Sequence, residues 1–293
     1  MHLRRCSFAD MTTNEAADSA PATHPAAARL SPVSRTALSV ARVRAYESAQ
    51  SEPLFTDPYA LAFIEAAGAP LPTAGPTEPF ARVLVARGIM RTRFYDDRLL
   101  AAGVRQVVLL AAGLDTRAHR LEWPSGTRLF EIDLPVVLDF KQGVLDERAA
   151  GARCERIALA ADLADPGWTE RLLAAGFDPG EPTVWLAEGL LVYLDAEQAA
   201  GLLAAVGGLS APGSRLLTEQ GRDVSGVPVV AGLAEMTALW RGGLGTGTAD
   251  WLDAHGWRTD FTAIDAFAAS LGRGLPPVGD FTGAGFLEAR RVA

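Results

Sequence analysis

The sequence has almost no lysine, little cysteine and no long apolar run. Lys141 is the only lysine among 293 residues, so a phosphate-binding G-x-x-x-x-G-K-[ST] loop is excluded and a Schiff-base mechanism would depend on this one residue. Cys6 and Cys154 are too few for a disulfide framework, which favours a reducing, cytoplasmic location. A membrane-spanning helix needs about 18 consecutive apolar residues, and none occur. The first residues lack the apolar centre of a secretion signal, so we expect neither export nor membrane insertion.

Several catalytic and binding motifs are also missing. Neither the nucleophile elbow G-x-S-x-G nor the zinc motif H-E-x-x-H occurs. The acidic residues are dispersed over the chain without a histidine or cysteine cluster, so we expect no metal site. The net charge of −8 and the lack of a basic stripe argue against a nucleic-acid partner. From the composition we therefore expect an ordinary globular enzyme that acts on a small molecule. The sequence does not indicate the oligomeric state.

An apolar run that ends at one glycine is the most informative segment. Residues 107–117, VVLLAAGLDTR, predict a buried parallel strand, a tight turn and a helix start. Ala111, Gly113 and Thr116 stand where the dinucleotide motif G-x-G-x-x-G has glycines. Asp115 would set a carboxylate against a pyrophosphate at the helix start. A phosphate-free nucleoside with ammonium and sulfonium groups avoids this conflict, and S-adenosylmethionine fits that description. A nicotinamide-dependent oxidoreductase, which also needs a turn and a downstream acid, is the alternative.

Three later strands are predicted over 128–133, 155–161 and 183–187. An acidic residue either ends each strand or directly follows it. Asp133 lies 20 residues after Gly113, the spacing at which nucleotide-binding folds place a ribose-binding carboxylate. Asp162 and Leu163 offer an acceptor for the adenine amine and an apolar side chain for its ring. Glu188 ends the series. Because ligands gather outside the carboxyl ends of parallel strands, we expect these side chains to share one crevice, although Asp is also a common helix cap.

Longer motifs extend this pattern and resemble the leucine carboxyl methyltransferase-like family, including its polyketide and actinobacterial O-methyltransferase branch. The shared segments are RTRFYDD at 91–97, AGLDTR at 112–117, FEID at 130–133, DL at 162–163 and AEGLLVYL at 187–194. The resemblance covers about residues 34 to 291. It implies an α/β class I methyltransferase fold of the Rossmann-like type that uses S-adenosylmethionine. Such a fold has a mostly parallel seven-stranded sheet with an antiparallel last strand, here with an N-terminal helical addition and an inserted cover segment. Ala111 replaces the first loop glycine of the leucine carboxyl methyltransferases proper, which favours the polyketide and actinobacterial branch.

The resemblance also implies roles for individual residues. They are Arg91 at the methionine carboxylate, Gly113 under the methionine moiety, Asp133 at the ribose, Asp162 and Leu163 at the adenine, and Glu188 near the amino group. Arg87 and Arg93 are neighbours that compete for the place of Arg91, and Glu188 has a second interpretation as an ion-pair partner of Arg91 or Arg93. Tyr193 is interpreted as a wall of the acceptor pocket. His119 and His255 are interpreted as structural, and no catalytic residue is assigned.

Composition and periodicity divide the chain into a tail and one domain. Residues 1–30 are expected to be disordered or an over-long start, with Met11 as a possible initiator. The domain spans 31–293, with N-terminal helices in 31–102, a cofactor-binding half in 103–220, a cover insertion in 221–249, and C-terminal strands and helices in 250–293.

These expectations suggest direct SN2 transfer of a methyl group to oxygen. A carboxylate acceptor is already ionised at neutral pH and needs no general base, whereas a phenol with a pKa of about 10 needs one. Because no base is evident, a carboxylate is favoured over a phenolic hydroxyl. A non-catalytic cofactor-binding protein on the same fold is a further alternative.

Overall fold

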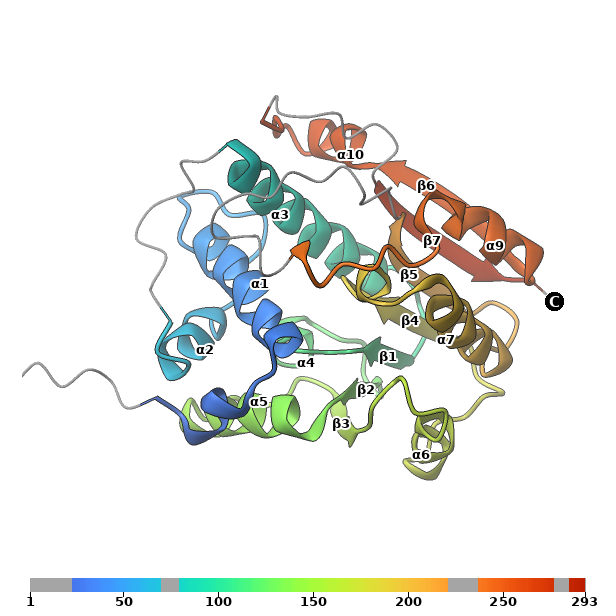
Figure 1. Cartoon of the computed structure of the whole chain (residues 1–293), viewed down its shortest axis with the longest axis horizontal. Coiled ribbons are helices and arrows are strands. Elements are labelled where there is room, and N and C mark those ends of the chain that lie inside the picture. Colours follow the sequence, from blue (N-terminus) through green and yellow to red (C-terminus); the bar gives the residue numbers. More distant parts are fainter. Residues whose placement is uncertain (1–22, 70–78, 221–236, 277–284, 293) are drawn as a thin grey trace, which may run out of the picture.

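The computed structural model describes residues 23–69, 79–220, 237–276 and 285–292, and one seven-stranded sheet organises them (Figure 1). The strand order is β3-β2-β1-β4-β5-β7-β6. The strands are β1 Gln106–Leu110, β2 Arg128–Asp133, β3 Glu155–Ala160, β4 Thr183–Ala187, β5 Arg215–Gln220, β6 Trp257–Ala263 and β7 Gly285–Arg291. The pairs among β1 to β5 are parallel, while β7 is antiparallel to both β5 and β6. The predicted α/β class, with an antiparallel last strand, is confirmed.

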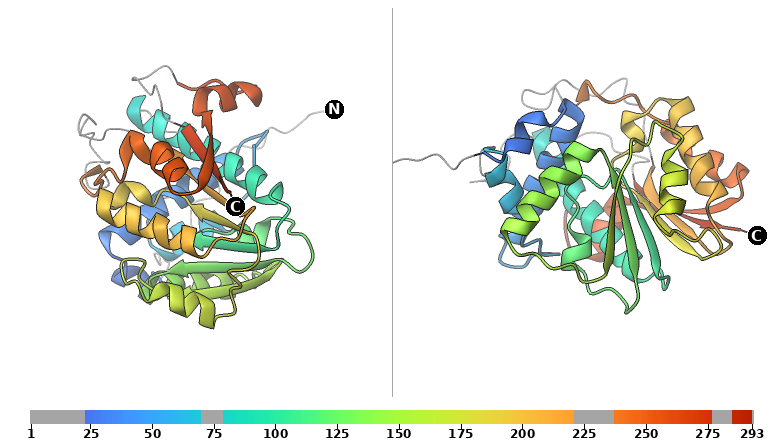
Figure 2. Two further views of the ribbon diagram at one scale, coloured as in Figure 1. Left: turned by 90° about the vertical axis from the view of Figure 1, so that its right-hand side faces the viewer. Right: turned by 90° about the horizontal axis from the view of Figure 1, so that it is seen from below.

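Helices cover both faces of the sheet, as two further views show (Figure 2). They are α1 Pro32–Ser48, α2 Ala60–Ala66, α3 Pro79–Leu100, α4 Arg117–Arg120, α5 Pro135–Glu147, α6 Trp168–Ala174, α7 Ala196–Gly208, α9 Thr248–Ala254 and α10 Ile264–Ser270. Short 3-10 helices are η1 Pro25–Arg29, η2 Leu191–Tyr193 and η3 Gly245–Gly247. In the described part of the chain, no helix is both long and apolar enough to cross a membrane.

The central strands are buried on both faces, which explains their continuous apolar sequences. Side chains alternate across a strand, so Val107 and Leu109 pack with α3 and α10, whereas Val108 and Leu110 pack with α6, α7 and α9. All five residues of β1 and of β4 are buried. This two-sided burial holds the carboxyl ends of these strands in fixed positions.

The N-terminal part differs from the sequence expectation. Residues 1–30 were expected to be a disordered tail, but Pro25–Arg29 forms η1, and Ala26, Ala27 and Leu30 are buried in a cluster with α2 and α5. The stretch 25–30 therefore belongs to the folded domain, while 1–22 lies outside the described residues. Apolar residues recur at helical spacing over 36–49, which predicts an amphipathic helix there. The helix α1 begins earlier, at Pro32, because the Ser31 hydroxyl caps its first turn.

Lys141 is a residue of α5, and its side chain is fully buried. Its ammonium group is 2.8 Å from Oε2 of Glu131 on β2, whose side chain is also fully buried. Arg156 of β3 contacts the same oxygen, with Nε at 2.9 Å. Lys141 is thus a structural cation, which leaves no role for it in Schiff-base chemistry with a dissolved substrate.

Candidate functional site

The turn after β1 and the acid at the end of β2 meet directly. Gly113 has a φ of +51°, and its amide donates a 2.6 Å hydrogen bond to Oδ2 of Asp133. The other oxygen, Oδ1, accepts from the amide of Leu134 at 2.7 Å. Burial raises the pKa of Asp133, although the two amide hydrogen bonds oppose this effect. The structure therefore brings together Gly113 and Asp133, which the spacing of 20 residues had paired.

The end of β3 lies beside this junction. The amide of Ala161 donates to the backbone carbonyl oxygen of Asp133 at 2.9 Å, so the next residue, Asp162, follows the same edge of the sheet. Asp162 is exposed, and its Oδ1 accepts from the amide of Ala164 at 2.9 Å. Leu163 is half-buried against the apolar cluster below. The predicted ribose and adenine residues thus stand at adjacent strand ends.

The end of β4 carries an ion pair between two predicted residues. Arg91 Nε is 2.9 Å from Glu188 Oε1, which is the alternative partner that the sequence offered for Glu188. Arg91 Nη1 is 3.1 Å from Oε1 of Glu219, at the end of β5. Burial lowers the pKa of Arg91, but the charges of Glu188 and Glu219 outweigh it and raise the pKa. Arg93 instead pairs with Asp97 and donates to the carbonyl oxygen of Leu54, so it is engaged away from these acids.

A second arginine, Arg117, is buried behind this edge. Its guanidinium binds Asp96 at 2.7 Å, Glu188 at 2.8 Å and the carboxylate of Asp115. Burial alone would raise the pKa of Asp115, but Arg117 and other cations lower it to about 2. Asp115 therefore does not present a bare carboxylate, and α4, with only four residues, offers little helix dipole. The expected conflict between Asp115 and a pyrophosphate is weaker than the sequence suggested, because its charge is already compensated.

The N-terminal helix α1 and Asp57, which precedes α2, contact the turn that follows β1. Arg44 of α1 donates to the carbonyl oxygen of Leu114 at 2.6 Å and to Oδ2 of Asp57 at 2.7 Å. The hydroxyl of Thr116 donates to the same Asp57 oxygen at 2.8 Å. The pair Asp57-Pro58 is typical of a helix start, and Asp57 has this role too, since its Oδ1 accepts from the amides of Tyr59 and Ala60. A buried cation and anion thus tie α1 to the turn.

Tyr193 lies in η2, which follows the Glu188 turn. Tyr193 is half-buried and lies close to Arg91. It adds to the pKa of that guanidinium, but less than Glu188 and Glu219 do. The chain after residue 240 docks on this segment: the amide of Arg241 donates to Val192 O at 2.7 Å, and the amide of Gly243 donates to Leu194 O at 2.9 Å. The predicted cover insertion therefore touches η2 at its described end. The sequence of the insertion also predicts a helix over 230–240. Residues 221–236, which hold most of this predicted helix, lie outside the described residues.

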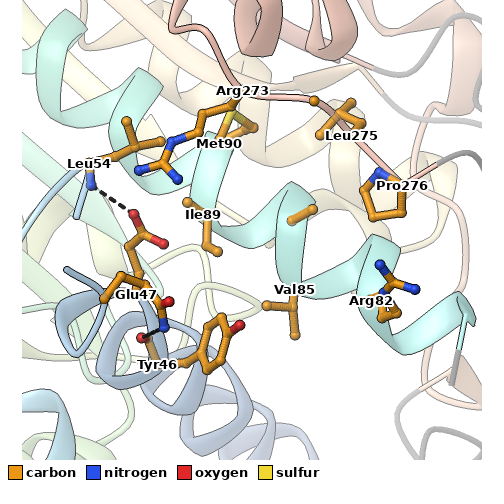
Figure 3. Close-up of a pocket in the computed structure, with 13 residues that line it drawn as sticks. Tyr46, Glu47, Leu54, Arg82, Val85, Ile89, Met90, Arg273, Leu275 and Pro276 are labelled. Carbon is orange, nitrogen blue, oxygen red and sulfur yellow. Dashed lines mark hydrogen bonds between the residues drawn. The ribbon is translucent and has the colours of Figure 1, made fainter. Parts of the chain in front are cut away.

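A pocket of about 270 Å³ lies between α1, α3 and residues 273–276 (Figure 3). Ile89 and Met90 line it from α3, and Glu47 lines it from α1. The Glu47 carboxylate is buried and accepts a 2.7 Å hydrogen bond from the amide of Leu54. None of the predicted cofactor residues lines this pocket. It is separate from the edge at which Gly113, Asp133 and Glu188 gather.

Comparison with known proteins gives matches in both sequence and structure. The family described as leucine carboxyl methyltransferase matches residues 37–207. A protein of Frankia alni is 53% identical over 270 residues, covering 88% of this chain and 94% of its own length. One from Streptomyces avermitilis is 43% identical over 270 residues, covering 87% and 94%. Both carry the name "Putative S-adenosyl-L-methionine-dependent methyltransferase".

Among solved structures, one described as a "putative methyltransferase" from Thermobifida fusca YX has a TM-score of 0.50 at 18% identity. It covers 86% of this chain and 94% of that chain, which supports the shared fold and nothing finer. The family match contains Arg91, Asp133 and Glu188 but ends before Glu219.

Proposed function

The chain belongs to the leucine carboxyl methyltransferase family, and from this premise we propose that it transfers a methyl group to a carboxylate oxygen of a small-molecule acceptor. It is a methyltransferase, and its cofactor is S-adenosylmethionine. The main support for this site is the contact between Gly113 and Asp133 at the carboxyl ends of β1 and β2. Nucleoside ligands bind at this edge in open α/β sheets.

The side chains at this edge suit the chemistry of the cofactor. Each oxygen of Asp133 accepts one amide hydrogen bond and keeps a second lone pair for a ribose hydroxyl. Glu188 is an acceptor for an ammonium group, and Arg91 is a cation for a carboxylate. Leu163 offers an apolar surface to an adenine ring. In this proposal no residue has to bind a phosphate, in keeping with a cofactor that has none.

The proposed reaction needs little acid–base catalysis from the protein. The bound cofactor supplies a methyl group that its positive sulfur already activates. Asp133, Glu188 and Arg91 would hold the nucleoside and methionine ends so that the acceptor oxygen lies in line with the methyl carbon. Orientation of this kind is worth up to about 7–11 kcal/mol. A carboxylate acceptor is already ionised at neutral pH before it binds, so it needs no general base.

The described histidines support a reaction without a base. His24 packs against Phe140, His255 stacks on Trp251, and the ring of His119 packs against Tyr59. The side chain of His119 is also buried, which shields it from a dissolved acceptor. Their contacts fit the structural interpretation of His119 and His255 made from the sequence, and this is why we favour a carboxylate over a phenolic hydroxyl.

The test is methyl transfer from isotope-labelled S-adenosylmethionine to panels of small carboxylic acids and of phenols, with products identified by mass spectrometry. We expect a methyl ester, which mild alkali cleaves, whereas a methyl ether survives. A labelled ether as the main product would contradict the carboxylate proposal and favour a phenolic acceptor.

Calorimetry with S-adenosylmethionine and with NAD separates the remaining alternatives. We expect heat of binding for the methyl donor only. Binding of NAD alone would contradict the proposed function, and cofactor binding without transfer to either panel would favour a non-catalytic binding protein.

A further inference from the structure

Arg91 is held by two carboxylates that come from neighbouring strand ends. Glu188 follows β4 and Glu219 lies near the end of β5, at 2.9 and 3.1 Å from the guanidinium nitrogens. The three side chains are 20%, 14% and 22% exposed, so all are largely shielded from water. Sequence analysis did not identify Glu219, and its role is not explained by the cofactor contacts assigned above.

Glu219 is fixed by the backbone next to Glu188. Both of its carboxylate oxygens accept from the amide of Gly189 at 3.0 Å. Gly189 has a φ of +62°, and a Cβ there would lie 3.0 Å from Arg91 Nη1. The glycine therefore allows the guanidinium to approach the turn closely. Glu219 thus contacts both Arg91 and the Gly189 amide, while Gly189 leaves room for the guanidinium.

Glu188, in contrast, divides its charge between two arginines. Its Oε2 is 2.8 Å from Arg117 Nη1, and Arg117 also binds Asp96 and Asp115. If Glu188 turns toward a cofactor ammonium group, Arg117 keeps two carboxylate partners, whereas Glu219 is the one carboxylate that still pairs with Arg91 among the described residues. Without any partner, a shielded guanidinium would be costly and poorly oriented.

We propose that Glu219 is a positioning residue that keeps Arg91 aimed at the carboxylate of the cofactor's methionine end while Glu188 binds the amino group. This inference rests on the proposed function. It assigns to β5 a part in cofactor binding that lies outside the segment matched by the family. Its effect should be limited to ligands that carry the methionine carboxylate, because Glu219 acts through Arg91.

The experiment compares two ligands by calorimetry on wild type and Glu219→Gln. S-adenosylhomocysteine carries the amino-acid end, whereas 5′-methylthioadenosine has the same adenine and ribose without it. Gln keeps an acceptor oxygen and loses the charge. We expect S-adenosylhomocysteine to bind about tenfold more weakly and 5′-methylthioadenosine to change by less than about twofold. In an Arg91→Met background, adding Glu219→Gln should have no further effect on S-adenosylhomocysteine.

Two further variants control for damage to the fold. Gln220→Ala alters the neighbouring residue, whose side chain bonds to the carbonyl oxygen of Thr246, and should leave both affinities unchanged. Glu219→Asp retains the charge and should bind S-adenosylhomocysteine more tightly than Glu219→Gln, so it tests the inference even if the Gln variant folds poorly.

Equal weakening of both ligands by Glu219→Gln, or no weakening of either, would overturn the inference. An additive loss in the Arg91→Met background would do the same. A wild-type protein that binds neither ligand would instead contradict the proposed function, so the two failures are distinguishable.

Discussion

Asp133 joins the end of β2 to the turn after β1, because its carboxylate accepts a 2.6 Å hydrogen bond from the amide of Gly113. Replacing it with Ala removes the acceptor proposed for the ribose and the acceptor that holds the turn. We expect affinity for S-adenosylmethionine to fall by more than about 1.4 kcal/mol, which is tenfold, in calorimetric titration. The matched control is Asp139→Ala, an exposed acid on α5, which should not change the affinity. Unchanged binding by a folded Asp133→Ala protein would remove Asp133 from the site.

Single residues of the site were predictable where the signal is local in sequence. The meeting of Gly113 with Asp133 follows from strand ends and a known spacing, and the structure confirms it. The assigned cofactor roles remain predictions. Glu219 and Asp57 were missed because their partners are 128 and 59 residues away, Arg91 and Thr116 respectively. The motifs offered Glu188 as a partner of Arg91, but no motif includes Glu219 or Asp57, so nothing in the sequence indicated their pairs.

At the scale of elements, the docking of residues 241–247 on η2 provides a test with an internal control. Gly243 and Gly245 have φ values of +56° and +55°, but only at Gly243 would a Cβ meet backbone, 2.6 Å from Leu191 O. Gly245→Ala should cost about 1–2 kcal/mol, the penalty of the left-handed conformation alone. Gly243→Ala should lower the free energy of unfolding, measured in urea, by more than this, and it should speed hydrogen exchange of the amide at position 243. Equal costs for the two variants would mean that the close approach to Leu191 is relaxed in solution.

The elements themselves were largely predictable. The predicted bounds 128–133 and 183–187 agree with β2 and β4, because apolar runs between turn residues determine them. The sequence of 285–291 likewise predicts a strand, and this segment forms β7. The sequence DAEQ at 195–198 is typical of a capped helix start, and in α7 Asp195 and Gln198 form a capping box. The helix η1 was not, because Pro25–Arg29 has no periodicity of its own and its alanines are buried only by contact with α2 and α5. Burial that depends on a distant partner leaves no local pattern.

At the scale of the whole molecule, buried ion pairs should make stability sensitive to acid. The pKa of Asp115 is lowered to about 2 from an ordinary 3.8, mainly by Arg117, and the pKa values of Asp57 and Glu188 are also lowered by arginines despite burial. A lowered pKa means that the stabilisation is complete above pH 3.8 and is lost as the pH falls toward 2. For Asp115 alone this amounts to on the order of 2 kcal/mol.

We therefore expect the free energy of unfolding of the cofactor-free protein to decrease as the pH falls from about 4 to 2. Asp115→Asn should be less stable at neutral pH and should have a shallower slope in this range, as measured by urea titrations at several pH values. Asp139→Asn, at an exposed position, should retain the wild-type slope. A slope unaffected by Asp115→Asn would show that Arg117 does not stabilise the ionised carboxylate.

The antiparallel direction of β7 was predictable only through the resemblance to a family, and the sequence analysis made no prediction of the strand order, because strand lengths alone do not determine which edge a strand joins. The position of β7 between β5 and β6 depends on hydrogen bonds between residues far apart in the chain.

The burial of Lys141 in its pair with Glu131 has a practical consequence for labelling. Amine-reactive esters find no other lysine in this sequence, so Lys141 should remain unlabelled in the folded molecule. A dye on Lys141 would then report that α5 has separated from the sheet, which makes the single lysine a built-in sensor of opening.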